Sequence, residues 1–188
     1  MKITILNGDL NPTTNSFSRK VEAYVEELRK SNRVDLFTLA QMDLHYCTGC
    51  WSCWWKTPGE CAINDDAEII FRSVINSDLV IFASPLIAGF PSSALKKIMD
   101  RLIVLLHPYI EIVNGECHHR KRYEKYPNLG LILEKEPDTD DEDIKLVKDI
   151  FDRLAINFHS KLVFVKMIDE VTKLDFVIME EVRNDEKI

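Results

Sequence analysis

Four of the five cysteines lie in one short segment, residues 45–64, and thiols at this density are candidate metal ligands. Short x2 spacings let consecutive thiolates point at one centre, as an iron–sulfur cluster requires, and a tetrahedral zinc site could use the same ligands. A reactive dithiol and a set of cysteines without metal remain open alternatives. The segment has the spacing C-x2-C-x2-C-x7-C, with its thiols at Cys47, Cys50, Cys53 and Cys61.

A polar loop near the N-terminus is a second candidate site. Residues 7–18 concentrate small hydroxyl and amide side chains directly before a helical pattern that begins at Ser16. Backbone N–H groups and hydroxyls in such a loop can hold a phosphate without a lysine. Asn15 or Ser16 could instead be a simple helix N-cap. The loop contains neither GxGxxG nor GxxxxGK[ST], so no motif supports a dinucleotide site or a P-loop.

The hydrophobic pattern predicts the elements that must position these segments. Strands are predicted at residues 2–6, 34–39, 79–83, 129–133 and 161–167, and Phe176–Met179 is a further candidate for an edge strand. Helical spacing covers residues 16–28, 65–75, 92–103 and 144–154. Strands that are apolar throughout and alternate with helices are typical of a parallel sheet covered on both faces. The sequence therefore predicts one doubly wound α/β domain over residues 1–188.

In such a sheet, ligands bind at the carboxyl ends of the strands, which directs attention to the loops after strands one, three and four. The third-strand loop covers residues 83–93, and Ser92 or Ser93 can cap the helix that follows it. The fourth-strand loop is the acidic run 134–141, which we interpret as a solvated helix start. We expect Cys117, His118 and His119 to lie in a surface loop.

Composition excludes several classes of protein. The chain has 188 residues with 24 Lys and Arg against 31 Asp and Glu, so its formal charge is −7. This acidic balance provides no footprint for nucleic acid, whose phosphates are bound by clustered basic residues. Since no apolar stretch approaches the roughly 20 residues that span a bilayer and no signal-peptide pattern is present, we expect a cytoplasmic protein without a membrane segment.

The third-strand loop and its helix resemble a known family. The run Ser84-Pro85-Leu86, followed by Leu95-Lys96 and Asp100-Arg101, looks like the loop and helix of the NAD(P)H-dependent FMN reductases. The resemblance covers about the first 135 residues and implies a flavodoxin-like three-layer sandwich, with a five-stranded parallel sheet in the order 2-1-3-4-5. It also implies bound FMN, with the phosphate at Asn15, Ser16 and Ser18 and the flavin ring at Ser84, Pro85, Leu86 and Gly89.

Three departures from that family's pattern support an alternative. Asp9 stands where the family usually has serine, Leu86-Ile87 replaces a pair that carries a tyrosine, and the fourth-strand loop is acidic. A carboxylate beside a phosphate opposes binding unless it points away. The alternative is a flavin-free flavodoxin-like binding or scaffold protein whose cysteine loop holds zinc or nothing.

The cysteine segment resembles the compact motif of the iron-sulfur flavoproteins, a branch of the same superfamily. That resemblance implies a [4Fe–4S] cluster near FMN. We therefore predict an FMN-binding oxidoreductase that takes electrons from NAD(P)H or a small redox protein and needs no catalytic acid or base. Trp51, Trp54 and Trp55 in the same segment indicate a covering surface, and hence a homodimer or higher homo-oligomer.

Overall fold

The main sheet contains five parallel strands. The structure is a computed structural model in which residues 1–173 are described, so the candidate strand Phe176–Met179 lies outside the described residues. The strands lie in the order β2-β1-β3-β7-β8, which confirms the predicted order 2-1-3-4-5. Their bounds are β1 Lys2–Asn7, β2 Arg33–Thr38, β3 Leu79–Ile87, β7 Asn128–Glu134 and β8 Leu162–Met167.

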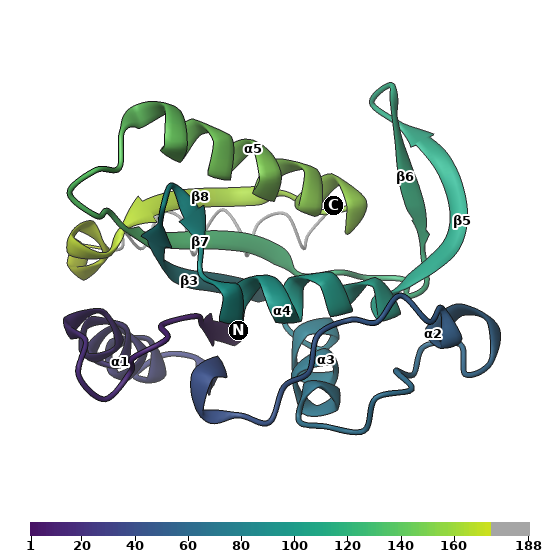
Figure 1. The fold of residues 1–188 in the computed structure, drawn as a ribbon, viewed down its shortest axis with the longest axis horizontal. Coiled ribbons are helices and arrows are strands. Elements are labelled where there is room, and N and C mark those ends of the chain that lie inside the picture. The colour runs from purple at the N-terminus through teal and green to yellow at the C-terminus, as the bar shows by residue number, and fades with distance from the viewer. Residues whose placement is uncertain (174–188) are drawn as a thin grey trace.

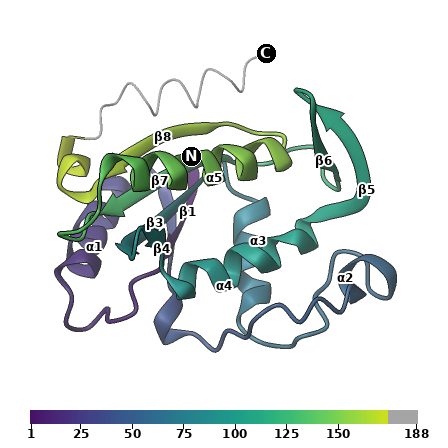
Figure 2. The ribbon, with the colours of Figure 1, turned by 45° about the horizontal axis from the view of Figure 1, so that its top comes forward.

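Helices cover both faces of this sheet (Figures 1 and 2). One face packs against α3 (Ala67–Ile75), α4 (Ser93–Arg101) and α5 (Asp141–Asn157). The other face packs against α1 (Ser16–Arg29) and the 3₁₀ segment Ile168–Lys173. This arrangement confirms the doubly wound flavodoxin-like class.

The residues of β3 show why the sheet needs two apolar layers. Val80 and Phe82 face the α3, α4 and α5 side, whereas Leu79 and Ile81 face the α1 side. Successive residues of a strand point to opposite faces of the sheet. Because helices cover both faces, all four side chains are fully buried. An apolar run without alternation is therefore what a sheet covered on both faces requires.

Strand β3 is longer than the sequence predicts. It continues past Ala83 to Ile87 and then turns back through Ala88 and Gly89, whose φ angles are 49° and 77°. The short strand β4 (Phe90–Pro91) then pairs antiparallel with β3. The prediction of a long loop after the third strand is therefore wrong. The chain forms a tight hairpin there, and β4 adds a sixth strand to the sheet.

A second hairpin replaces the surface loop expected around Cys117. Strands β5 (Leu106–Val113) and β6 (Glu116–Lys121) pair antiparallel and extend beyond the end of the sheet (Figures 1 and 2). The turn is Asn114-Gly115, with positive φ at both residues, which matches a two-residue hairpin turn. The loop prediction was wrong, and His118 is buried in β6.

The cysteine segment lies at the same end of the molecule as this hairpin (Figure 1). It is mostly irregular, apart from the short helix α2 (Ser52–Trp55). The 3₁₀ segment Leu39–Gln41 precedes the cysteine segment, and the 3₁₀ segment Leu102–Leu105 follows α4. Across the described residues, no helix combines the length and apolarity needed to cross a bilayer.

Candidate functional site

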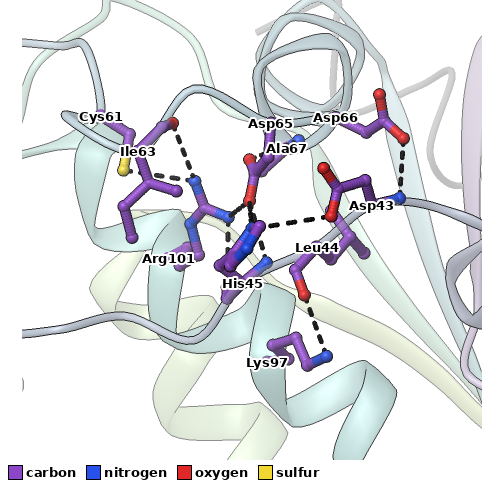
Figure 3. Close-up of polar contacts among 10 residues, drawn as sticks. All are labelled: Asp43, Leu44, His45, Cys61, Ile63, Asp65, Asp66, Ala67, Lys97 and Arg101. Carbon is purple, nitrogen blue, oxygen red and sulfur yellow. Dashed lines mark hydrogen bonds and ion pairs between the residues drawn. The ribbon is translucent and has the colours of Figure 1, made fainter.

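A buried ion pair anchors the cysteine segment to the end of α4 (Figure 3). Arg101 Nη1 lies 2.5 Å from Asp65 Oδ2, and the two side chains are 1% and 0% exposed. Through Nη2 the same guanidinium donates a hydrogen bond to Cys61 Sγ at 3.3 Å, and through Nη1 it donates to the carbonyl of His45 at 3.2 Å. Arg101 therefore holds both ends of the cysteine segment against one helix.

The charges of this pair are held in their ionised forms. Burial by itself raises the pKa of Asp65, but hydrogen bonds from Arg101 and from the backbone N–H groups of His45 and Ala67 lower that pKa to about 2. Burial opposes the charge of Arg101 as well, but the hydrogen bonds to Asp65 and Cys61 raise its pKa above the ordinary value. The sulfur of Cys61 thus lies beside a permanent positive charge.

The four predicted metal ligands border the same small cavity. Cys47, Cys50, Cys53 and Cys61 all line one small cavity, which Arg101 also lines. Cys47 and Cys50 are exposed, while Cys53 and Cys61 are half-buried. The cavity therefore opens to solvent on the side of the first two thiols.

This donor set fits a soft metal centre, since thiolates are the preferred ligands of zinc and of iron–sulfur clusters. The cavity has a volume of about 30 Å³, roughly two to three times the 10–15 Å³ of cavity space that one buried water needs. Within residues 1–173, no group of three or more His, Cys, Asp or Glu side chains stands in metal-binding geometry. An eight-atom cluster would thus require the exposed thiols to move outward.

The two central thiols differ in acidity. Hydrogen bonds from the side chain and backbone of Ser52, and from Thr48, lower the pKa of Cys50. Burial raises the pKa of Cys53, and the neighbouring thiols Cys61, Cys47 and Cys50 raise it further. Mutual repulsion of this kind is expected where several thiols surround one centre, and a bound cation would relieve it.

Trp54 docks the cysteine segment onto the start of the β5–β6 hairpin. Its indole N–H donates to the carbonyls of Ile103 at 3.3 Å and Leu106 at 3.1 Å. Its ring lies 5.0 Å from the ring of His119 and 5.2 Å from that of Trp51. Trp51 and Trp55, in contrast, are exposed.

The N-terminal polar loop is built around a carboxylate. Asp9 is 1% exposed. Its oxygens accept hydrogen bonds from the backbone N–H of Asn11 at 3.0 Å, from Asn15 Nδ2 at 3.2 Å and from Ser18 Oγ at 2.8 Å. Asn15 is also the N-cap of α1, as anticipated, since its Oδ1 accepts from the N–H of Phe17. Ser16, the third predicted phosphate ligand, is exposed at the first position of α1.

These hydrogen bonds to Asp9 affect whether the loop can bind a phosphate. The side chains of Asn15 and Ser18 that would bind the phosphate already bind Asp9. While they do so, the loop does not fit a phosphate dianion, because that anion would meet a buried carboxylate in place of free donors.

Ser92 clamps this loop to the start of α4. Its hydroxyl accepts from the N–H of Leu95 as the N-cap of α4 and donates to the carbonyl of Gly8. Gly8 N–H in turn donates to the carbonyl of Ala83 at 2.8 Å. A Cβ atom on Gly8 would lie 2.8 Å from Ser92 Oγ and from Leu95 Cβ, so this position requires glycine.

The predicted ring-side residues lie in or beside the β3–β4 hairpin. Ser84, Pro85 and Leu86 belong to β3 and are buried, and Leu86 packs into the core. Gly89 is at the turn, where a Cβ atom would lie 2.5 Å from Asp143 Oδ1. The turn therefore touches the start of α5, whose acidic residues form a capping box between Asp140 and Asp143, as the helix-start interpretation predicts.

A larger cavity of about 670 Å³ lies behind the cysteine segment. It is lined by residues 58–61, Ile63 and Asn64, by α3, and by Arg122 and Tyr123 before β7. Cys61 lines this cavity as well as the small one. It therefore lies between the cavity of the four thiols and a larger cavity lined by both polar and apolar residues.

Sequence reasoning missed the partnership of Asp65 with Arg101, although Asp65 begins the predicted helix 65–75 and Arg101 ends the family-like run Asp100-Arg101. A signal was present, because Ala94, Ile98 and Arg101 follow the i, i+4, i+7 spacing of one buried helix face. An arginine on that face needs a buried acid as partner.

Comparison with known proteins finds a flavin reductase family and several iron-sulfur flavoproteins to which the chain is similar. The sequence profile of a family described as NADPH-dependent FMN reductase matches residues 1–121. An iron-sulfur flavoprotein of Methanocaldococcus jannaschii is 32% identical over 101 residues, which are 54% of this chain and 51% of that protein. An iron-sulfur flavoprotein of Archaeoglobus fulgidus is 34% identical over 91 residues, 48% of this chain and 40% of that protein. The chain thus spans about half the length of the curated relatives it matches.

Solved structures agree on the fold. An FMN-dependent NADH-azoreductase from Bacillus anthracis, solved in complex with FMN, superposes with a TM-score of 0.58. That alignment covers 98% of this chain and 94% of the azoreductase at 11% identity. At such low identity the likeness extends to the fold alone.

Proposed function

The chain belongs to the NADPH-dependent FMN reductase family, and from this premise we propose that it is an FMN-dependent oxidoreductase with an iron–sulfur centre. The ligands of the centre are Cys47, Cys50, Cys53 and Cys61. The flavin site combines Asn15, Ser16 and Ser18 at its phosphate end with Ser84, Pro85, Leu86 and Gly89 at its ring end.

The observation that carries this proposal is that all four thiols line one cavity beside Arg101. The curated relatives at 32% and 34% identity are themselves named iron-sulfur flavoproteins. Two exposed and two half-buried thiols, with the basic side chain of Arg101 beside one of them, suit a cluster that exchanges electrons with a partner.

Helix α4 relates the two sites. Its N-cap, Ser92, is hydrogen-bonded to the phosphate loop, and its last residue, Arg101, is hydrogen-bonded to Cys61. At 1.5 Å per residue, these nine steps separate the two contacts by about 14 Å. When bound, FMN and a [4Fe–4S] cluster supply hydride acceptance and single-electron transfer, respectively. The chain itself supplies position and charge: α4 fixes the spacing, and Arg101 keeps a positive charge at Cys61.

The donor and the assembly are part of the same proposal. The family description supports a nicotinamide as electron donor, and a small redox protein is the other candidate. We place the protein in the cytoplasm, where thiol ligands stay reduced. Residues 1–188 are proposed to form one domain, and the exposed apolar side chains at the hairpin end support a homodimer.

The test is an ultraviolet–visible spectrum with iron and zinc analysis on protein purified without oxygen. We expect flavin bands together with stoichiometric iron. The variant Cys61→Ser should lose most of the iron, because three thiolates hold a cubane cluster poorly. The matched control is Cys117→Ser, since Cys117 is an exposed cysteine on β6 outside the cysteine segment. The control should keep the iron content of the wild type.

A second candidate function is favoured by two observations. The cavity of about 30 Å³ is small for an eight-atom cluster, and Asp9 occupies the donors of the phosphate loop. Both agree with a flavin-free binding or scaffold protein that holds zinc. Colourless protein with zinc, or with no metal, and with no spectral change on addition of FMN would support this alternative and reject the oxidoreductase.

A further inference from the structure

The buried carboxylate of Asp9 works against a phosphate at the flavin site. Building on the proposed flavin site, we propose that Asp9 acts as an internal anion that replaces the phosphate of the ligand, so that the chain holds FMN loosely and accepts riboflavin at least as well. The substrate class of the site is then a flavin recognised by its ring and ribityl chain, with the terminal phosphate making no favourable contact.

The hydrogen bonds around Asp9 are fixed in direction. Asn7 Nδ2 donates to Ser18 Oγ at 2.9 Å, so the single hydroxyl proton of Ser18 is directed to Asp9. Asn15 Oδ1 accepts from Phe17 N–H, which leaves its amide group to donate to Asp9. Asn7 Oδ1 accepts from the backbone N–H of Asp9 at 3.1 Å.

A phosphate could take these donors only by displacing the carboxylate. Asp9 would then remain buried without the hydrogen bonds from Asn15 and Ser18, next to a second anion. Both effects weaken binding of the phosphate group, and neither affects a flavin without phosphate. The loop is also held in place from outside, since Gly8 is tied to Ala83 and Ser92.

The experiment measures the affinities of FMN and riboflavin by equilibrium dialysis, for the wild type and for Asp9→Asn and Asp9→Ser. We expect the wild type to bind FMN no more tightly than riboflavin. Both variants should bind FMN about tenfold more tightly or better and leave riboflavin nearly unchanged, because only the phosphate gains donors and loses a repulsive charge. Asp9→Asn is close in shape to aspartate, which guards against a failure of Asp9→Ser to fold.

The matched control is Glu22→Gln, which removes one negative charge from the exposed surface of α1. It should alter neither affinity. A wild type that binds FMN ten times more tightly than riboflavin would overturn this inference and leave the proposed function standing. So would Asp9 variants that fold and show no gain for FMN. If neither flavin binds to the wild type or to any variant, the proposed function itself is rejected.

Discussion

The side chain of Arg101 contacts a carboxylate, a sulfur atom and two backbone carbonyls. It pairs with Asp65, contacts Cys61 and binds the carbonyls of His45 and Ile63 (Figure 3). Two full charges in the interior are costly unless each satisfies the other, so the pair contributes more to defining the position of the cysteine segment than to net stability. Removing one partner is expected to be worse than removing both.

A double-mutant cycle tests this. Arg101→Met leaves Asp65 buried and uncompensated, and we expect it to lower the free energy of unfolding by about 3–5 kcal/mol. Asp65→Asn should also destabilise, and the double variant should lose less than the sum of the two. Urea unfolding followed by far-ultraviolet circular dichroism gives these values. The control is Arg72→Met, which breaks the exposed pair with Glu68 and should cost under about 0.5 kcal/mol. Additive losses would show that the two charges do not interact.

The same pair makes stability depend on pH. The pKa of Asp65 falls from its ordinary value of 3.8 to about 2 in the folded protein. A lowered carboxyl pKa contributes stability that is fully present above the unfolded value and is lost as pH falls through the folded one. The wild type should lose this contribution between about pH 4 and pH 2. Asp65→Asn lacks it, so the stability difference between the two proteins should shrink over that range in urea titrations. A constant difference would contradict the assignment.

At the scale of elements, the hydroxyl of Ser92 connects the phosphate loop to α4 through two hydrogen bonds. Ser92→Ala removes the N-cap and leaves the buried carbonyl of Gly8 without its donor, and we expect a loss of about 2 kcal/mol. Ser93→Ala is a close control, because Ser93 is the adjacent serine and is exposed at the first position of the helix. It should change stability by less than about 0.5 kcal/mol. Thermal unfolding of both variants compares them directly, and equal effects would remove Ser92 from this role.

The elements that sequence patterns predicted well are those with long apolar runs or caps. The strand order, the helix at Ser16 and the capping role of Asn15 all follow from periodicity and hydrogen-bond chemistry. The extension of β3 was missed because Pro85 and Gly89 are ordinarily signs of a loop, yet Pro85 lies in register with Glu134 of β7. The pairing of strands distant in sequence determined that outcome.

The candidate site was only partly accessible to the same reasoning. The spacing of the cysteines identified the four thiols that line one cavity, because all four lie close together in the sequence. The contacts of Asp9 with Asn15 and Ser18 depend on how the loop folds back onto α1, which no periodicity reports. The β5–β6 hairpin did carry a signal, the Asn114-Gly115 turn, which polar residues in β6 obscured.

At the scale of the whole molecule, the β5–β6 hairpin forms an arm with exposed apolar residues. Tyr109, Ile110 and Ile112 are 59%, 51% and 68% exposed. A two-stranded hairpin is marginally stable by itself, and exposed apolar residues of this density mark an interaction surface. The arm lies beside the cysteine segment with its exposed Trp51 and Trp55, so one surface could be covered by a second copy of the chain.

Ile112→Asp tests this assembly. The charge should prevent burial of the arm and shift a dimer to monomers, as measured by light scattering after size exclusion. The same substitution at Ile69, which is 53% exposed on α3, provides the control and should leave the assembly unchanged. A monomeric wild type, or equal dissociation by both variants, would reject the arm as the interface.

The docking of Trp54 has a practical consequence for following unfolding. All three tryptophans of the chain lie within residues 51–55, and none lies in the sheet or its covering helices α1, α3, α4 and α5. Intrinsic fluorescence therefore reports on one small region: its emission should move to longer wavelength when the cysteine segment detaches from Ile103 and Leu106. If that segment melts before the sheet, fluorescence and circular dichroism will give different midpoints, and the gap between them measures how independently this region opens.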